Sequence, residues 1–186
     1  MTQSPHLHDH VLLREPGPGE GQALHELIRL SPPLDLNSSY CYFLLARHFR
    51  ETCVVAERDG SLAGCVTAYR RPDAPDTLFV WQVAVRAEQR GRGLAGRMLD
   101  VLLERPACRE VRFLETTVGP TNHASRRCFE RLAETRRCAV RQLPFLDPNH
   151  FGPDAQHEAE VLLRIGPFPL PPTASATHEG TRDGNL

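Results

Sequence analysis

The alternation of apolar and polar residues predicts where the first helices and strands lie. Residues 20–30 carry leucine and isoleucine at three- and four-residue intervals, the spacing of one helix face, and the prolines that follow end this helix. Residues 37–49 repeat this pattern with aromatic and leucine side chains and predict a second helix. Before the first helix, residues 11–16 form a short apolar run that is typical of a strand.

Extended segments follow the two helices. Residues 53–71 contain two apolar runs on either side of Asp59–Gly60, a dipeptide that favours a two-residue hairpin turn. Residues 76–85 are almost continuously apolar, which predicts a central strand covered on both faces. The later elements are expected to be a helix, a strand, a helix and two strands, at residues 94–105, 110–118, 122–133, 137–145 and 159–168.

This order of elements predicts an α/β fold in which a mixed sheet has helices on both faces. We expect one domain over residues 11–168, because a chain of 186 residues is long enough to bury a single core. Residues 1–10 are expected to form a flexible N-terminal tail. Residues 169–186 are rich in Pro, Ser, Thr and Gly, and we expect a disordered C-terminal tail there.

Composition and charge restrict the classes of function. The net charge of -1 provides no overall field that would attract nucleic acid or an anionic membrane. The N-terminus lacks a signal-peptide pattern, and no apolar stretch reaches the ~18 residues that a membrane helix requires. The six cysteines have no C-x-x-C spacing, so we expect neither a metal site nor a disulfide framework, and we expect a cytoplasmic protein. The histidines at 6, 8 and 10 fit a solvated tail better than a metal site.

Residues 83–99 pass from a strand to a helix through a turn rich in arginine and glycine. Gly91 and Gly93 permit backbone conformations that aim successive N–H groups at one point, beside the positive end of the following helix. Arg90 and Arg92 add charge that suits phosphate. From these residues alone, a helix-entry turn with solvated arginines is an equal alternative. The spacing fits neither a P-loop nor a dinucleotide-binding fingerprint.

Two motifs together settle this alternative. The turn resembles the acyl-CoA signature of the GNAT acetyltransferases, R/Q-x-x-G-x-G/A, here Arg90 to Ala95 after the strand WQVAV. The companion motif of that superfamily, N-x-x-A/S, is present at Asn122 to Ser125, where the next helix begins. The resemblance implies the GNAT fold, a mostly antiparallel sheet of about seven strands that is splayed between strands 4 and 5. It also implies acetyl-CoA as co-substrate, without a metal.

The resemblance further implies which residues bind the cofactor. The pyrophosphate would lie on the turn and the pantetheine arm along the preceding strand, with the second motif on the opposite wall. The cofactor-binding candidates are Val83, Ala84, Val85, Arg90, Gly91, Arg92, Gly93, Leu94, Ala95, Asn122 and Ser125. The sequence departs from the family at Phe129, where many members have a tyrosine proposed to protonate the departing thiolate. A phenyl ring cannot donate that proton, so water or the helix dipole would have to replace it.

Residues 11–168 are also similar to one branch of this superfamily, the diaminobutyrate acetyltransferases, through segments such as SPPLDLNSSY, FLETTVGPTNHAS and LLRIGPF. This resemblance implies acetylation of the γ-amino group of L-2,4-diaminobutyrate, a step of ectoine biosynthesis, by a homodimer. An acetyltransferase for another small amine, or a CoA-binding sensor without turnover, are the alternatives.

A small diamino acid carries two ammonium groups, so its site should offer carboxylates and an aromatic wall. Asp35 lies in the linker between the two early helices, and Tyr40 lies in the first turn of the second helix. Trp81 is on the strand before the glycine-rich turn, and His157 and Glu160 lie before the last strand. Each has a structural alternative: a helix cap for Asp35, plain core for Trp81, and surface positions for His157 and Glu160.

We expect direct transfer without an acyl-enzyme. The attacking amine must first lose a proton, which Glu160 or His157 would accept, and a backbone N–H near Val83 would stabilise the oxyanion. Glu115 is a further candidate base, with a buried carboxylate paired to arginine as its alternative. Three cysteines are conceivable nucleophiles but have no recognisable base partner: Cys41, Cys65 and Cys128.

Overall fold

A computed structural model describes residues 10–151 and 159–169. Within these residues seven strands form one sheet in the order β1-β2-β3-β4-β5-β7-β6. Neighbouring strands are antiparallel except β4 and β5, which are parallel. The predicted mixed, mostly antiparallel sheet is therefore confirmed. The strands are β1 (Leu12–Arg14), β2 (Val54–Arg58), β3 (Ser61–Arg71), β4 (Ala74–Val85), β5 (Phe113–Val118), β6 (Val140–Leu146) and β7 (Glu160–Ile165).

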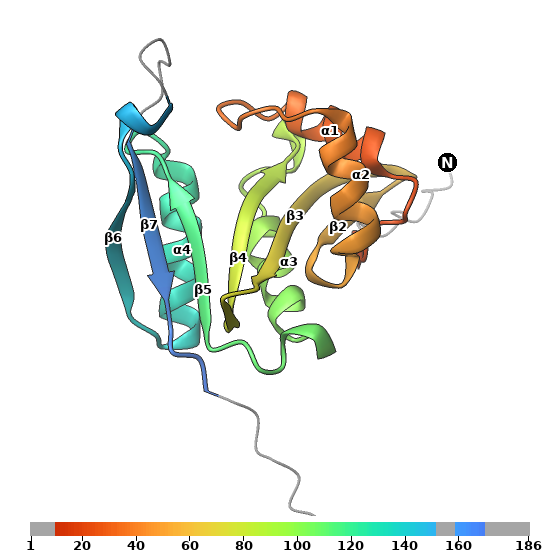
Figure 1. Ribbon diagram of the computed structural model, residues 1–186. Helices are drawn as coiled ribbons and strands as arrows, with labels where there is room; N and C mark the ends of the chain where they lie inside the picture. Colours follow the sequence, from red (N-terminus) through yellow and green to blue (C-terminus); the bar gives the residue numbers. More distant parts are fainter. Residues whose placement is uncertain (1–9, 152–158, 170–186) are drawn as a thin grey trace, which may run out of the picture.

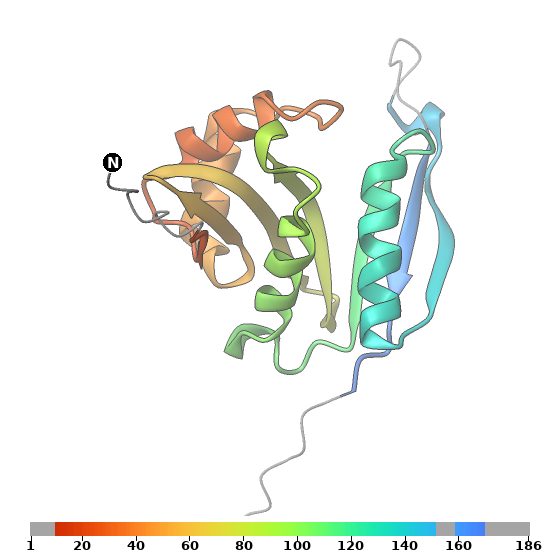
Figure 2. The same ribbon diagram turned by 180° about the vertical axis from the view of Figure 1, so that it is seen from behind.

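Helices cover both faces of the sheet, as predicted. Figure 1 shows α1 and α2 on one face, and Figure 2, from behind, shows α3 and α4 on the other. Two apolar cores fill the layers, one beneath α1 and α2 and a larger one beneath α3 and α4. The helices are α1 (Gly21–Arg29), α2 (Ser39–His48), α3 (Leu94–Leu103) and α4 (His123–Arg136), and short 3₁₀ turns are η1 (Arg50–Thr52), η2 (Ala87–Gln89), η3 (Pro106–Cys108) and η4 (Pro148–Phe151).

The hairpin between β2 and β3 has the turn that the sequence predicts. Asp59 and Gly60 both have positive φ, 51° and 73°, which is the backbone of the two-residue turn that matches the twist of paired strands. Arg58 pairs directly with Ser61 across this turn. The hairpin places the start of β3 beside the end of β4, where the glycine-rich turn begins.

β4 is the middle strand of the seven and contributes residues to the cores on both faces, as predicted, but its cover is uneven. Buried and half-buried residues alternate along it from Leu78 to Val85. A bulge interrupts the pairing with β3: Gln82 pairs with Thr67 and Val80 with Ala68, so Trp81 has no partner on β3. Val80 belongs to the core beneath α3 and α4, whereas Ala84 belongs to the core beneath α1 and α2. The bulge thus brings the neighbouring residues Trp81 and Gln82 to one cavity.

The sheet splits where β4 and β5 diverge. The two strands pair through Thr77 with Phe113, Leu78 with Leu114 and Phe79 with Glu115. Beyond these pairs the carboxyl halves of the strands separate, as Figure 1 shows, and the predicted splay between strands 4 and 5 is confirmed. Backbone groups along the diverging edges are therefore available to a ligand that inserts between the strands.

Some predictions concern residues that the structure does not describe. Both tails lie largely there, since residues 1–9, 152–158 and 170–186 are not described. The same holds for His6, His8 and His157. Among the described residues, no helix has the length and apolar character to cross a membrane, and no group of His, Cys, Asp and Glu side chains could hold a metal ion.

Candidate functional site

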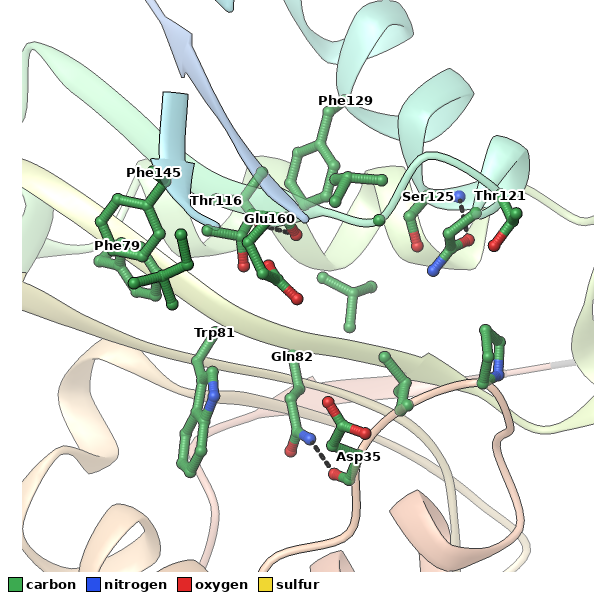
Figure 3. A pocket seen from close by; sticks show the side chains of 18 of the residues that line it. Asp35, Phe79, Trp81, Gln82, Thr116, Thr121, Ser125, Phe129, Phe145 and Glu160 are labelled. Atoms are coloured by element: carbon green, nitrogen blue, oxygen red, sulfur yellow. Dashed lines mark hydrogen bonds between the residues drawn. The ribbon is translucent and has the colours of Figure 1, made fainter. Parts of the chain in front are cut away.

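A pocket with a volume of about 830 Å³ lies where β4 and β5 diverge. Its walls come from distant parts of the chain: the loop between α1 and α2, the middle of β4, the end of β5, the start of α4, and the adjoining ends of β6 and β7. Figure 3 shows these walls from close by, with aromatic rings gathered at one end of the pocket. Phe79 and Phe145 lie there with ring centroids 6.5 Å apart. Tyr69 also lines the pocket, and its ring centroid is 5.4 Å from that of Phe79.

Three of the five predicted acceptor residues line this pocket, namely Asp35, Trp81 and Glu160. Asp35 and Glu160 come from opposite walls, one from the loop between α1 and α2 and the other from the first residue of β7, with Trp81 to one side (Figure 3). Asp35 does not cap α2, because the N-cap of that helix is Ser38. The pocket therefore combines two carboxylates and an indole, a set that suits a small molecule with two ammonium groups.

Gln82 is a site residue that the sequence did not indicate. Its side chain lines the pocket, and its Nε2 donates a hydrogen bond of 2.7 Å to the carbonyl oxygen of Asp35. Its Oε1 accepts a bond of 3.2 Å from the hydroxyl of Tyr42, which in turn accepts one of 3.3 Å from the backbone N–H of Asn37. Burial raises the pKa of the Tyr42 phenol, so the hydroxyl stays a donor at neutral pH. This network fixes the loop that carries Asp35 onto β4.

Tyr40 is not brought into the pocket. It is 70% exposed, whereas Tyr42 is completely buried beneath α2. The two residues are about 200° apart around the helix axis, so only one of them can face the sheet. The prediction that Tyr40 binds the acceptor is therefore wrong for this pocket, because the side chain lies on the outer face of α2.

Glu115 is a buried carboxylate paired with arginine, which was the structural alternative to a role as catalytic base. Its side chain is buried, and its two oxygens pair with Arg71 on β3, at 2.7 Å, and with Arg164 on β7. It is not among the residues that line the pocket. Because both carboxylate oxygens are engaged by guanidinium groups, the structure removes Glu115 from the candidate bases.

The glycine-rich turn has the backbone that an anion site requires. Gly91 and Gly93 have φ of 76° and 71°, in the left-handed region that favours glycine. Gly93 is the N-cap of α3, so the first-turn N–H groups of that helix open onto the turn. The turn follows directly after β4, which contributes Val83 to the pocket. Leu94 is buried in the core, so it can serve a ligand through its backbone alone.

The second motif forms the opposite wall. Asn122 and Ser125 line the pocket, and Asn122 caps α4 by accepting a bond of 3.1 Å from the backbone N–H of Ser125. Phe129 lies two turns farther along α4, is 2% exposed and also lines the pocket. The position where many family members have tyrosine therefore faces the cavity in this chain too.

The cysteines, all six of which the structure describes, do not line the pocket. Burial raises the pKa of the Cys65 thiol to about 12 and that of the Cys53 thiol to about 11, so both are protonated at neutral pH. Burial also raises the pKa of Cys41 and Cys128. None of these thiols has the low pKa of a catalytic nucleophile.

Comparison with known proteins agrees with this arrangement. The model of the Acetyltransferase (GNAT) family matches residues 22–133. The L-2,4-diaminobutyric acid acetyltransferase of Bordetella parapertussis is 54% identical over 161 residues, which cover 86% of this chain and 86% of the relative. The enzyme of the same name from Halomonas elongata is 42% identical over 159 residues, covering 85% of this chain and 82% of the relative.

A solved structure is similar over nearly the whole fold. It is the diaminobutyrate acetyltransferase EctA from Paenibacillus lautus in complex with its substrate L-2,4-diaminobutyric acid and coenzyme A. The two chains share 44% identity and a TM-score of 0.84, over 88% of this chain and 98% of the other. This chain belongs to the GNAT acetyltransferase family and, within it, to the L-2,4-diaminobutyric acid acetyltransferases.

Proposed function

We propose that this protein transfers the acetyl group of acetyl-CoA to the γ-amino group of L-2,4-diaminobutyrate, giving Nγ-acetyl-L-2,4-diaminobutyrate and CoA. The names of its relatives support this reaction, which is a step of ectoine biosynthesis. The observation that carries the proposal is the pocket at the split of the sheet, where Asp35 and Glu160 lie on opposite walls beside Trp81. Two separated carboxylates match the two ammonium groups of the acceptor.

Acetyl-CoA would occupy the split between β4 and β5. Its pyrophosphate would bind the N–H groups around Gly91 and Gly93, which the N-terminus of α3 and the charge of Arg90 and Arg92 support. The pantetheine arm would follow the free edge of β4 at Val83 to Val85, with Asn122 and Ser125 on the other side. The thioester would then reach the pocket at the middle of β4.

The chemistry would be a direct attack on the thioester. The γ-ammonium loses a proton to Glu160, directly or through water, and the free amine attacks the carbonyl carbon. A backbone N–H near Val83 stabilises the oxyanion, the attacking nitrogen gives up its second proton to water, the C–S bond breaks, and the thiolate leaves. His157, which lies outside the described residues, is a second proposed acceptor of the proton. Because Phe129 cannot donate a proton, the thiolate takes one from water or is stabilised by the helix dipole.

Regioselectivity would come from positioning. The α-amino group of the acceptor is the less basic of the two, so acidity alone favours reaction there. Asp35 would hold the α-ammonium on the roof of the pocket, and the γ-nitrogen would then be the one beside Glu160 and the thioester. Holding the reacting groups in place can outweigh a difference in basicity.

The proposal includes a cytoplasmic homodimer. Six cysteines without a disulfide among them suit a reducing compartment. The strand β6 is at the edge of the sheet and exposes the apolar side chain of Leu143, a position that a second copy could cover.

Release of free thiol from acetyl-CoA, measured with a panel of amines, tests the proposed reaction. The panel contains L-2,4-diaminobutyrate, ornithine, lysine, spermidine and an aminoglycoside. Fast release with diaminobutyrate alone supports the proposal. Faster release with a polyamine or an aminoglycoside would assign another acceptor, and CoA binding without release for any amine would indicate a sensor.

A further inference from the structure

The turn before α3 is attached to the hairpin between β2 and β3. The backbone N–H of Arg86 donates a bond of 2.9 Å to the carbonyl oxygen of Ala63, and its guanidinium donates to the carbonyl of Leu62. Three residues later, the side-chain oxygen of Gln89 accepts a bond of 3.0 Å from the guanidinium of Arg58, the last residue of β2. Both ends of η2 are thereby held by the same hairpin.

Gln89 differs from its neighbours in the turn. It is 9% exposed, whereas the four residues that follow it, 90–93, are exposed. A buried side-chain amide requires a hydrogen-bond partner, and Arg58 supplies it. The backbone N–H of Gln89 also closes the 3₁₀ turn η2, since it donates a bond of 2.9 Å to the carbonyl oxygen of Arg86.

The glycine part of the turn has little packing of its own. A side chain added at Gly91 or Gly93 would meet no atom within 4 Å, and both residues have the conformational freedom of glycine. An anion site made of backbone N–H groups binds well when those groups are already oriented, since ordering them on binding costs free energy. The orientation must therefore come from the residues that flank the glycines: Leu94 is buried in the core after Gly93, and Gln89 is the buried residue on the other side of the turn. Arg90, between Gln89 and Gly91, is exposed and donates a bond of 3.0 Å to the carbonyl oxygen of Val85.

We infer that Arg58 and Gln89 are positioning residues for the CoA pyrophosphate. Their hydrogen bond orients the turn at 90–93 without either side chain lining the pocket. The inference rests on the proposed function, because it presumes that CoA is the ligand of this turn. Arg58 also carries charge that would attract a phosphate directly, so the test has to separate the bond from the charge.

Gln89→Leu separates them, because it removes the acceptor and leaves every charge in place. We expect the Kd for CoA, measured by calorimetry, to rise about fivefold, the effect of one hydrogen bond. Dephospho-CoA retains the pyrophosphate, so the Kd for dephospho-CoA should rise by the same factor. The KM for diaminobutyrate and the kcat at saturating acetyl-CoA should stay within about twofold, because the acceptor side does not depend on this bond.

Arg58→Lys keeps the charge, weakens the same bond because the shorter lysine lacks the guanidinium geometry, and serves as the second variant should Gln89→Leu fail to fold. The double variant should bind CoA no more weakly than either single variant, rather than the about 25-fold more weakly expected of independent sites. The matched control is Gln22→Leu, the same change on the exposed surface of α1, which should leave the Kd unchanged.

Unchanged CoA affinity in folded Gln89→Leu would overturn the inference. The inference would also be overturned if the two rises in the Kd for CoA multiplied in the double variant. An equal rise in the KM for diaminobutyrate, or an unaffected Kd for dephospho-CoA, would overturn it as well. Failure of the unaltered protein to acetylate diaminobutyrate while it binds CoA normally would contradict the proposed function and leave this comparison of affinities valid.

Discussion

The side-chain amide of Gln82 donates a hydrogen bond of 2.7 Å to the main-chain carbonyl of Asp35, 47 residues earlier in the chain. A residue of the central strand thereby holds the loop that forms the roof of the pocket. The same glutamine accepts a bond from Tyr42 on α2, whose hydroxyl accepts one from the backbone N–H of Asn37, so the loop is held at two nearby positions. The position of the Asp35 carboxylate thus depends on a buried network whose own members have no charge.

Gln82→Leu should weaken acceptor binding. The leucine keeps the volume but releases the Asp35 carbonyl, and we expect the KM for diaminobutyrate to rise about fivefold, equivalent to ~1 kcal/mol. The KM for acetyl-CoA should remain unchanged, which steady-state kinetics with each substrate varied will show. Tyr42→Phe removes the neighbouring bond and should raise the same KM by less. Equal effects on both Michaelis constants would mean that Gln82 supports the fold rather than the loop.

Glu160→Gln should act on turnover. The amide cannot accept the proton of the γ-ammonium, so kcat should fall by about a hundredfold or more, and the acidic limb of the pH–rate profile should move or vanish. Asp35→Asn is the comparison, because it should raise the KM for diaminobutyrate and allow some α-acetyl product. A Glu160→Gln enzyme with the original pH profile would contradict the assignment and point to His157.

Glu115→Gln should affect stability and leave catalysis intact. Its carboxylate joins Arg71 and Arg164, which lie on the two sides of the split, at the last pair between β4 and β5. Loss of the charge should lower the free energy of unfolding by about 2–3 kcal/mol, less than for a fully dry pair because both arginines are partly exposed. Urea unfolding measures this change, and kcat with its pH profile is measured on folded enzyme.

A surface pair provides the control for Glu115. Glu110 pairs with Arg70 at 3.2 Å and is 79% exposed, so Glu110→Gln should change the free energy of unfolding by less than about 0.5 kcal/mol. Loss of the acidic limb of the pH–rate profile in Glu115→Gln would restore it as a candidate base.

Alkaline pH should destabilise the fold through its buried thiols. Burial raises the pKa of Cys53 to about 11 and that of Cys65 to about 12, from an ordinary value of 9.0. Their stabilising effect is complete below pH 9.0 and is lost as the pH rises toward these values, because the unfolded thiols ionise first. Each thiol lowers the free energy of unfolding by up to about 1.4 kcal/mol per pH unit in this range.

Cys65→Ala tests this slope. Urea unfolding at several pH values above about 9 should show a weaker loss of stability with pH than in the unaltered protein, whatever the change in absolute stability. The half-buried Cys138 is the matched position, and Cys138→Ala should alter the slope less. An unchanged slope in Cys65→Ala would mean that other groups govern the alkaline transition.

Local chemistry accounts for the features that could be predicted from the sequence. The hairpin at Asp59–Gly60 and the turn at Gly91 and Gly93 depend on which residues tolerate positive φ, and that property belongs to the residues themselves. Apolar periodicity likewise predicted the order of the helices and strands. Asn122 of the second motif is the N-cap of α4, and the preference of asparagine for this position allowed the start of the helix to be predicted.

The features that were missed depend on contacts between distant segments. The bulge at Trp81 is a property of the register between β3 and β4, and it is what brings Gln82 into the pocket. The exposure of Tyr40 depends on the orientation of α2 on the sheet, which its sequence neighbours do not determine. The partners of Glu115 come from strands 44 and 49 residues away, so its sequence neighbours gave no sign of them.

Transfer of labelled acetyl is the measurement that addresses the proposed reaction most directly. The protein is incubated with acetyl-CoA carrying a ¹³C-acetyl group and with L-2,4-diaminobutyrate, and the product is identified by two-dimensional NMR. We predict that the labelled carbonyl correlates with the γ-methylene protons, with no labelled protein detected by mass spectrometry. A correlation with the α-proton, a stable acetylated protein, or the absence of transfer to diaminobutyrate would contradict direct acetylation of the γ-amine.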